Sequence, residues 1–337
     1  KMMEEGKLTS VKLTQAYIVR IDALNKRGPG LNAVTQLNKD ALKEAALMDK
    51  ERKAGKIRGP AHGLPVLLKD LIDVKGMYTS NGNYSLRNSF PEDDSGIVKK
   101  LRASGVVILG KLGLSEYANS FGNQPSGFSN LTGQVIHALD ADQNPSGSSS
   151  GSGTAGAAAL SMLTIGTETS GSIISPSRAQ GIVGLRPTVG LVPGYGIAPI
   201  SASQDIAGPM TRTVADAAMT LQSIVGPDPL SDLAYANMFG VPYDDVIPPL
   251  PAVLPSYMDA LDLSFVQGKR IGYNGALDAT PPATGRTPVG IAYDVLVAAG
   301  AIMVSRPTIA VPSIPALPSG YEQHKSIDGY YARLGPD

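Results

Sequence analysis

Residues 144–172 read NPSGSSSGSGTAGAAALSMLTIGTETSGS and decide the fold. They contain a Gly/Ser loop, a helix of very small side chains over 155–160, an apolar strand at 163–165 and a second polar loop. A Gly/Ser run is more often a flexible linker, but a linker does not usually start a buried helix. A helix of such small residues makes sense only when closely packed. A polar loop directly after a strand is where α/β proteins place chemistry.

The flanking sequence repeats a unit of helix, glycine and apolar strand. Residues 95–104 are predicted to be helical, Gly105 ends that helix, and residues 106–109 form a strand. The same elements return near the end of the chain: strand 270–273, helix 289–298, Gly300 and strand 301–304. Such units imply parallel pairing in a layered fold. The expected fold class is therefore α/β, with a mixed, largely parallel twisted sheet flanked by helices.

We expect the chain to form a single domain over residues 1–337. Apolar residues at helical spacing predict a helix over 10–25 with Thr9 or Ser10 as its N-cap, and a more charged helix follows at 38–54. Both ends of the sequence look cut, so the domain is expected to be incomplete at its C-terminus. The expected parts are N-terminal helices in 8–55, a catalytic core in 63–228, a surface excursion in 226–257 and a C-terminal βαβ part in 269–337.

The composition excludes several functional classes. Hydrophobic residues make up 42% and charged residues 17%, as in globular proteins. The 29 basic and 29 acidic residues balance, so nothing indicates a phosphate-binding surface for nucleic acid. The absence of cysteine excludes disulfides and thiolate chemistry. The three histidines are isolated, and no apolar run reaches the roughly 18 residues of a membrane span. We expect a soluble protein with no metal, cofactor, nucleic-acid or membrane partner, and no signal peptide can be identified; compartment and oligomeric state stay open.

Five motifs follow one another along the chain: GLPVLLKD (63–70), SGSSSGS (146–152), GTETSGSI (166–173), GIVGLRPTVG (181–190) and SQDIAGPMTRTVADA (203–217). Ser148 precedes Ser172 by 24 residues (172 − 148). The motifs and this spacing resemble the amidase-signature family, and their variants are most similar to its peptide-amidase branch. The resemblance runs from about residue 8 to residue 228 and more loosely beyond.

The resemblance implies a catalytic triad of Ser172 as nucleophile, Ser148 as bridging serine and Lys69 as base. It further implies a cis peptide bond between Gly147 and Ser148, and a supporting role for Ser149. The same family places an oxyanion hole at the backbone N–H groups of Thr169, Ser170, Gly171 and Ser172.

This chemistry agrees with the residues themselves. A serine hydroxyl needs a base to become a good nucleophile, and no histidine lies in any of these motifs. A lysine can be that base only when it is neutral. Its reference pKa is about 10.4, so a half-neutral lysine at pH 7 requires about 4.6 kcal/mol, which burial can supply. The apolar residues 66–68 before Lys69 predict such burial, although a lone lysine after a strand more often faces solvent.

The chain departs from the family pattern at two positions near the nucleophile. Ser170 stands where the family commonly has glycine, and Ile174 stands where an arginine often follows. Family members also continue beyond the end of this chain.

Five further polar residues are expected to have structural roles. We expect Asp70 to point away from Lys69, Asp205 to hold loop structure and His62 to lie in a loop. Arg186 and Arg212 are expected to form structural ion pairs rather than to contact substrate.

The leading hypothesis is an amidase that converts a carboxamide, either a small amide or a peptide C-terminal amide, to a carboxylate and ammonia through an acyl-enzyme. One alternative with the same fold is the glutaminase subunit of a tRNA-dependent amidotransferase. Another is an inactive relative that serves as a binding protein.

Overall fold

The computed structural model describes residues 2–122, 124–231, 249–273, 287–305 and 321–332. The chain divides into two compact units. One unit comprises residues 1–255 and 320–337, and the other comprises residues 256–319. Each unit is described by itself.

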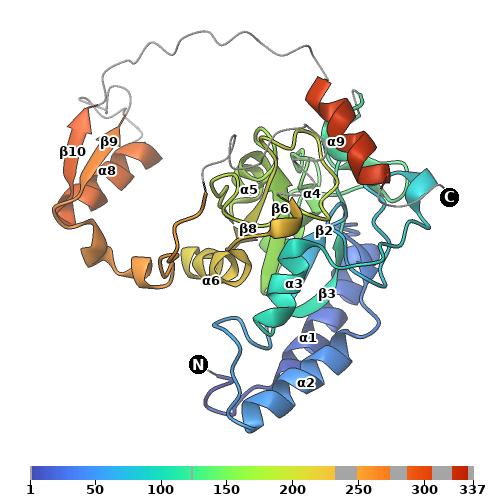
Figure 1. The fold of residues 1–337 in the computed structure, drawn as a ribbon, viewed down its shortest axis with the longest axis horizontal. Coiled ribbons are helices and arrows are strands. Elements are labelled where there is room, and N and C mark those ends of the chain that lie inside the picture. The colour runs from blue at the N-terminus through green and yellow to red at the C-terminus, as the bar shows by residue number, and fades with distance from the viewer. Residues whose placement is uncertain (1, 123, 232–248, 274–286, 306–320, 333–337) are drawn as a thin grey trace. The chain divides into compact units, whose positions relative to one another are not determined.

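Helices and strands alternate along the larger unit, as the sequence pattern predicts (Figure 1). Its helices are α1 (Ser10–Ile21), α2 (Ala41–Lys53), α3 (Gly96–Ala103), α4 (Ser150–Ala157), α5 (Ile174–Gln180), α6 (Val214–Ile224) and α9 (Tyr321–Ala332). Its strands are β1 (Val34–Leu37), β2 (Pro65–Lys69), β3 (Val107–Leu112), β4 (Phe128–Ser129), β5 (Gly133–Gln134), β6 (Leu163–Glu168), β7 (Val183–Gly184) and β8 (Ile206–Thr211).

A six-stranded sheet in the order β1-β3-β2-β6-β8-β7 forms the centre of this unit. The three central strands β3, β2 and β6 run parallel. The pairings of β1 with β3, β6 with β8 and β7 with β8 are antiparallel. The expected mixed α/β sheet flanked by helices is confirmed, and its parallel strands form the middle of the sheet. Because β2 and β6 are parallel neighbours, their C-terminal ends lie at the same edge.

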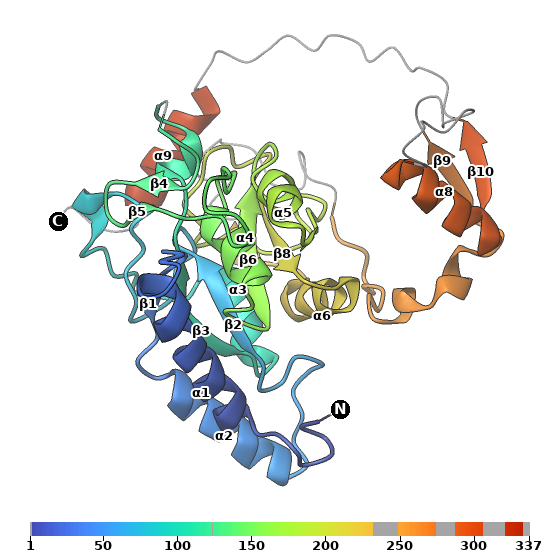
Figure 2. The ribbon, with the colours of Figure 1, turned by 180° about the vertical axis from the view of Figure 1, so that it is seen from behind.

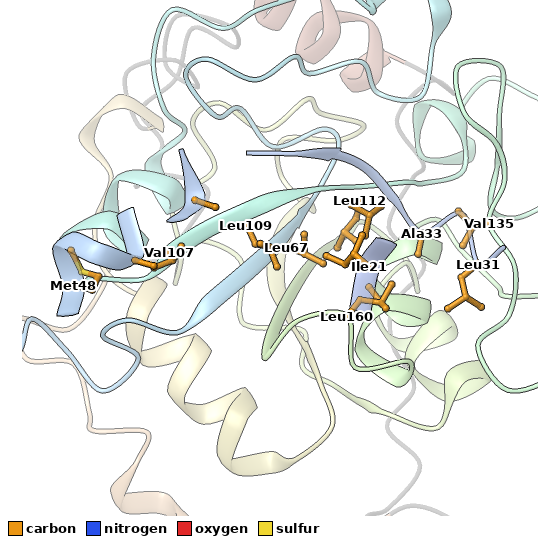
Figure 3. Packing of buried hydrophobic residues seen from close by; sticks show 14 residues of the cluster. Ile21, Leu31, Ala33, Met48, Leu67, Val107, Leu109, Leu112, Val135 and Leu160 are labelled. Carbon is orange, nitrogen blue, oxygen red and sulfur yellow. The ribbon is translucent and has the colours of Figure 1, made fainter. Parts of the chain in front are cut away.

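The N-terminal helices bury their apolar stripe against this sheet. Thr9 caps α1 by accepting a hydrogen bond from the Lys12 backbone N–H at 3.1 Å, which confirms the first of the two expected N-caps. Figure 3 shows the core cluster that α1, α2 and α4 share with β2 and β3. Ile21 of α1, Met48 of α2 and Leu67 of β2 belong to it, so the three layers are joined by one apolar core.

Helix α4 packs against the strands as closely as its small residues allow. A Cβ atom added to Gly151 would lie 2.4 Å from the carbonyl oxygen of Gly113 and 2.7 Å from that of Ala33. Such distances are too short for any side chain, so only glycine fits at this position. The helix in the 144–172 stretch is therefore buried, and the linker alternative is wrong. The helix spans Ser150–Ala157 rather than the expected 155–160, because residues of the Gly/Ser loop form its first turns.

The smaller unit contains the predicted βαβ arrangement. Strands β9 (Arg270–Tyr273) and β10 (Ile302–Ser305) pair in parallel, and α8 (Pro288–Ala298) lies between them in the chain. Figure 2 shows these elements from behind. Most of the expected surface excursion at 226–257 lies outside the described residues.

Candidate active site

Lys69 is the last residue of β2 and is fully buried. The preceding strand residues Val66, Leu67 and Leu68 are fully buried as well. The sequence predicted this burial from the apolar run, and the structure confirms it. A lysine in such a place must either form an ion pair or lose its charge.

The ammonium or amine group of Lys69 contacts neutral groups from two other segments. Its Nζ lies 2.7 Å from Ser148 Oγ and 3.0 Å from Thr167 Oγ1, both within hydrogen-bonding distance. The Thr167 carbonyl oxygen is farther away, at 3.4 Å. Because β2 and β6 are parallel neighbours, the ends of the two strands bring Lys69 and Thr167 together.

Burial lowers the pKa of Lys69 to about 7, while the negative charges of Asp205 and Glu168 act in the opposite direction. Desolvation is the largest cause because an ammonium loses its hydration in the core. The lysine is therefore present in both its charged and its neutral form near neutral pH. A neutral lysine can accept a proton, which a group with the ordinary lysine pKa rarely does at this pH.

The Gly/Ser loop before α4 places Ser148 beside this lysine. The Gly147–Ser148 peptide bond is cis, as the family resemblance implies. Ser149 fastens the loop to the end of β6, since its Oγ donates to the Thr167 carbonyl at 3.0 Å and accepts from the Thr167 N–H at 3.1 Å. The Ser149 N–H also donates to the carbonyl of Ser172 at 3.3 Å.

Ser172 lies in the loop between β6 and α5 and is partly exposed. Gly171 before it has a φ of +101°, a conformation that only glycine adopts without strain. Among the described residues, no hydrogen bond joins the Ser172 hydroxyl to Ser148, although both serines line the same pocket. Within the described part of the chain, the N–H groups of residues 169–172 also have no protein acceptor. They are therefore available to a ligand.

The pocket contains about 240 Å³ of empty space, including the part that is open to solvent. One group of lining residues is polar: Ser148, Thr167, Thr169, Ser172 and Asp205. The other group is apolar: Leu71, Ala118, Ile197, Ala198 and Ile200. The pocket thus combines hydroxyl groups with an apolar wall, a combination suited to a small uncharged group.

Glu168 closes the base of the loop that carries Ser172. Its Oε2 accepts hydrogen bonds from the N–H of Ile173 at 2.8 Å and of Ile174 at 3.0 Å. Its other oxygen lies 3.4 Å from Nε of Arg186. Arg186 is therefore in an ion pair, as expected, and Ile174 contributes only its backbone here. Ser170 is exposed on the same loop.

Asp205 holds loop structure, as expected, and also contacts the Ser172 loop. Its Oδ2 accepts from the N–H of Ile200 at 2.7 Å and of Ser201 at 2.9 Å. Its Oδ1 accepts from the hydroxyl of Thr169. The sequence did not predict this last contact, because Thr169 and Asp205 belong to different motifs and no pattern in the sequence links them.

The other polar candidates lie away from the pocket. Asp70 forms a buried ion pair with Lys111 at 3.2 Å, which agrees with the prediction that it points away from Lys69. His62 is buried, with its Nε2 at 3.0 Å from the Met48 carbonyl. Arg212 lies beside Tyr17: burial raises the pKa of this tyrosine, and Arg212 acts in the opposite direction. Among the described residues Arg212 forms no ion pair with a carboxylate, so the ion pair expected for it is not confirmed.

Sequence reasoning missed the hydroxyl of Thr167 as a partner of Lys69. It also missed the apolar wall formed by Leu71, Ala118 and the 197–200 segment. Thr167 lies within a quoted motif, so its position after a strand was the available signal. In the described ranges no helix is both long and apolar enough to cross a membrane, and no three acidic or histidine side chains form a group that could hold a metal ion.

The fold and site together describe an α/β protein that buries a lysine against a serine, at the C-terminal end of a central strand of a mixed sheet. The Amidase family profile matches residues 12–251, and the chain belongs to this family. The native peptide amidase from Stenotrophomonas maltophilia has a similar solved structure, with 46% identity and a TM-score of 0.80 over 90% of this chain and 60% of that one. This similarity supports the peptide-amidase branch.

Two relatives show the range of similar proteins. A probable amidase from Arabidopsis thaliana is 42% identical over 275 residues, which cover 80% of this chain and 50% of the relative. One glutamyl-tRNA(Gln) amidotransferase subunit, from Streptomyces avermitilis, is 35% identical over 268 residues, which cover 79% of this chain and 49% of the relative. The chain spans about half the length of these relatives.

Proposed function

We propose that the protein is an amidase that hydrolyses a carboxamide through Ser172, Ser148 and Lys69. The observation that carries the proposal is the fully buried Lys69, whose Nζ lies 2.7 Å from Ser148 Oγ. Ser148 and Ser172 line the same pocket. A buried lysine without a carboxylate hydrogen-bond partner has its pKa lowered to about 7. These are the properties that a general base needs near neutral pH.

In the first half of the proposed reaction, neutral Lys69 takes a proton from Ser148, and Ser148 takes one from Ser172. The Ser172 oxygen forms a bond to the amide carbon, and the carbonyl electrons move to the oxygen. The N–H groups of residues 169–172 stabilise this oxyanion. Removal of one such donor typically costs about 100- to 1000-fold in rate. The proton then returns through Ser148 to the nitrogen, the carbon–nitrogen bond breaks, and ammonia leaves.

In the second half, water attacks the acyl group on Ser172. Its proton passes to Lys69 through Ser148 and returns through Ser148 to the Ser172 oxygen as the acyl–oxygen bond breaks. The products are a carboxylic acid, which ionises to the carboxylate, and a regenerated serine beside neutral Lys69. No cofactor is needed, because each step is a proton transfer or an acyl transfer.

The lining of the pocket supports a neutral acyl group as substrate. Five of its ten lining residues are apolar, and its one acidic residue is Asp205. Arginine and lysine are absent from the lining as the structure describes it. A free amino acid such as glutamine carries a carboxylate, for which the described lining provides no cationic side chain. We therefore favour small amides and peptide C-terminal amides as substrates.

The test is ammonia release by the full-length protein from small amides, C-terminally amidated peptides and glutamine. Ser172→Ala should abolish turnover and leave the fold intact, since it removes one hydroxyl that has no hydrogen-bond partner among the described residues. Ser175→Ala is the matched control, because Ser175 is an exposed serine three positions further on and its variant should keep wild-type turnover. Wild-type activity in Ser172→Ala would contradict the assignment of the nucleophile.

The 35% identity to a glutamyl-tRNA(Gln) amidotransferase subunit keeps a glutaminase as the second candidate. Turnover of glutamine in preference to amidated peptides would favour it. The third candidate, an inactive binding protein, predicts that no amide is hydrolysed, while an amide ligand still protects the chain against thermal unfolding.

A further inference from the structure

Asp205 occupies the position just before β8, in the lining of the pocket. Three donors from two separate segments converge on its carboxylate. The hydroxyl of Thr169 comes from the loop that carries Ser172. The N–H groups of Ile200 and Ser201 come from the segment that forms the apolar wall. One side chain therefore joins the Ser172 loop to the segment of the apolar wall.

A carboxylate suits this place better than any neutral side chain. Two oxygens with about four lone-pair sites can accept all three hydrogen bonds at once. Hydrogen bonds to an ionised acceptor are roughly twice as strong as neutral ones. An asparagine has a single acceptor oxygen, so it can retain the contacts to one segment only by turning its NH₂ group toward the other.

The same loop is already fixed at its other end. Glu168 holds the N–H groups of Ile173 and Ile174, and Arg186 connects Glu168 to the carbonyl of Gln204 at 3.0 Å. Asp205 is the next residue. The loop of residues 169–172 is therefore held by two carboxylates, one at each end, and Arg186 connects the first of them to the backbone of the residue before Asp205.

We infer that Asp205 is a positioning residue, which holds Thr169 against the 200–201 segment and so fixes the distance from Ser172 and its neighbouring N–H groups to the opposite wall of the pocket. The inference rests on the proposed function, because it assigns Asp205 a task in that reaction. Asp205 acts through Thr169 and the wall, and it transfers no proton itself.

Such positioning should affect turnover more than substrate binding. A displacement of about 1 Å in a reacting group can lower a rate about 100-fold. The oxyanion must meet the N–H groups of residues 169–172 at hydrogen-bond distance, whereas an apolar acyl group tolerates a looser wall. Loss of the clamp should therefore lower kcat and leave KM nearly constant.

The central experiment removes the threonine side of the clamp. Thr169→Val keeps the shape and the backbone N–H but deletes the hydroxyl, and we expect kcat for an amidated peptide to fall about 10- to 100-fold with KM within about threefold of the wild type. Thr169→Ser restores the hydroxyl and should recover most of the turnover. A Thr169→Val variant with wild-type kcat would overturn the inference.

The Thr213–Asp216 pair provides a matched control. Its hydroxyl donates to the carboxylate at 2.8 Å, as in the clamp, but it caps α6 and does not line the pocket. Thr213→Val should lower the melting temperature and leave kcat unchanged. An equal loss of kcat in Thr213→Val and Thr169→Val would show that any lost threonine–aspartate pair has this effect, and the inference would fail.

A second variant tests the charge of Asp205, an effect that Thr169→Val does not share. Asp205→Asn removes the negative charge that raises the pKa of Lys69 against the effect of burial. If Lys69 is the base, kcat/KM rises with pH as this lysine loses its proton. In Asp205→Asn this ascending limb should move to lower pH, whereas Thr169→Val should leave it in place. A shift of the limb in Thr169→Val equal to that in Asp205→Asn would show that the hydroxyl contact acts on the pKa of Lys69 rather than on position, and it would overturn the inference.

Hydrogen exchange measures the clamp without turnover. In Asp205→Ala, the amides of Ile200 and Ser201 should exchange about tenfold faster or more, because each loses a hydrogen bond to a charged acceptor. Unchanged exchange would overturn the clamp even in an active enzyme. A wild-type protein that hydrolyses no amide would count against the proposed function alone, because the exchange result is independent of substrate.

Discussion

Two lysines lie fully buried on neighbouring strands, Lys69 on β2 and Lys111 on β3. Lys111 faces a carboxylate, since its Nζ lies 3.2 Å from Asp70 Oδ1 and also donates to the Tyr78 carbonyl at 3.1 Å and to Thr79 Oγ1 at 3.2 Å. The hydrogen-bond partners of Lys69 are all neutral. The same residue type thus forms part of a buried ion pair in one strand and has a lowered pKa in the next.

The difference shows that burial alone does not decide what a lysine does. A buried cation needs a nearby opposite charge, and without one the proton is lost more easily. Asp70 and Lys69 are adjacent in sequence, but the alternation of a strand directs their side chains apart. Asp70 is therefore available to Lys111, and Lys69 is left with hydroxyl partners only.

The strongest test of this contrast exchanges Lys69 for arginine. A guanidinium stays protonated at any accessible pH, so Lys69→Arg cannot act as a base. We expect both Lys69→Arg and Lys69→Ala to lose about 100- to 10,000-fold in kcat/KM, the range typical of a general base. The ascending limb of kcat/KM against pH should also disappear. An arginine variant with substantial activity would show that Lys69 stays charged and acts only by orienting Ser148.

Removal of the ion pair between Lys111 and Asp70 should lower the stability of the protein rather than its activity. Lys111→Met leaves Asp70 buried without its cation, a change that typically costs about 3–5 kcal/mol. The midpoint of urea unfolding should fall accordingly. The double variant Lys111→Met with Asp70→Asn should recover part of this loss, because it removes the second charge as well. A Lys111→Met protein of wild-type stability would indicate that the pair carries no charge in the folded state.

The pH dependence of stability should distinguish Lys69 from an ordinary lysine. Its folded pKa of about 7 lies below the ordinary lysine value of 10.5, so between these values the unfolded state binds the extra proton. The free energy of unfolding should therefore rise with pH in this window, by up to about 1.4 kcal/mol per pH unit. Burial of the charged Lys69 destabilises the folded protein fully below pH 7, and this effect is lost by pH 10.5.

Lys69→Met should remove this rise, and Lys12→Met, at an exposed position of α1, should keep it. Urea unfolding at several pH values between about 6 and 10 measures the slope. Equal slopes in the wild type and in Lys69→Met would mean that the folded protein does not lower the pKa of Lys69.

The smallest expected effect concerns one hydroxyl beside each lysine. Thr167 Oγ1 accepts from Lys69 at 3.0 Å, and Thr79 Oγ1 accepts from Lys111 at 3.2 Å. Thr79→Val should lower stability by about 1–3 kcal/mol without changing kcat. Thr167→Val should change kcat a few-fold and move the ascending limb to lower pH, because it removes an acceptor that favours the charged lysine. If the two variants changed stability and kcat in the same way, the two lysines would not differ in function as proposed.

The sequence predicted the elements of the fold better than their order in the sheet. Apolar periodicity and glycine positions predicted α1, α3, β2, β3 and the βαβ arrangement, because these depend on local backbone preferences. The antiparallel pairing of β8 with β6 was not predicted, since it joins strands that are far apart in the chain. Hydrophobic pattern specifies which face a strand buries, but it does not specify which strand it pairs with.

The same limit applies to the candidate site. Resemblance in motifs predicted that Lys69, Ser148 and Ser172 act together, and the structure places Lys69 against Ser148 and both serines in one pocket. The ion pair of Asp70 with Lys111 was not predicted, because the register of two strands determines it. The contact between Thr169 and Asp205 was missed for a related reason: two loops meet there, and loop contacts follow no periodicity.

The closeness of α4 to the strands has a consequence for how this protein tolerates change. Gly151 lies against the carbonyls of Gly113 and Ala33 with no room for a methyl group, and it follows Ser148 by three residues. A substitution at this glycine would push the helix start outward and carry the serine away from Lys69. A scan of all single substitutions should therefore find Gly151 as intolerant as the two serines of the proposed triad, although its side chain is only a hydrogen atom.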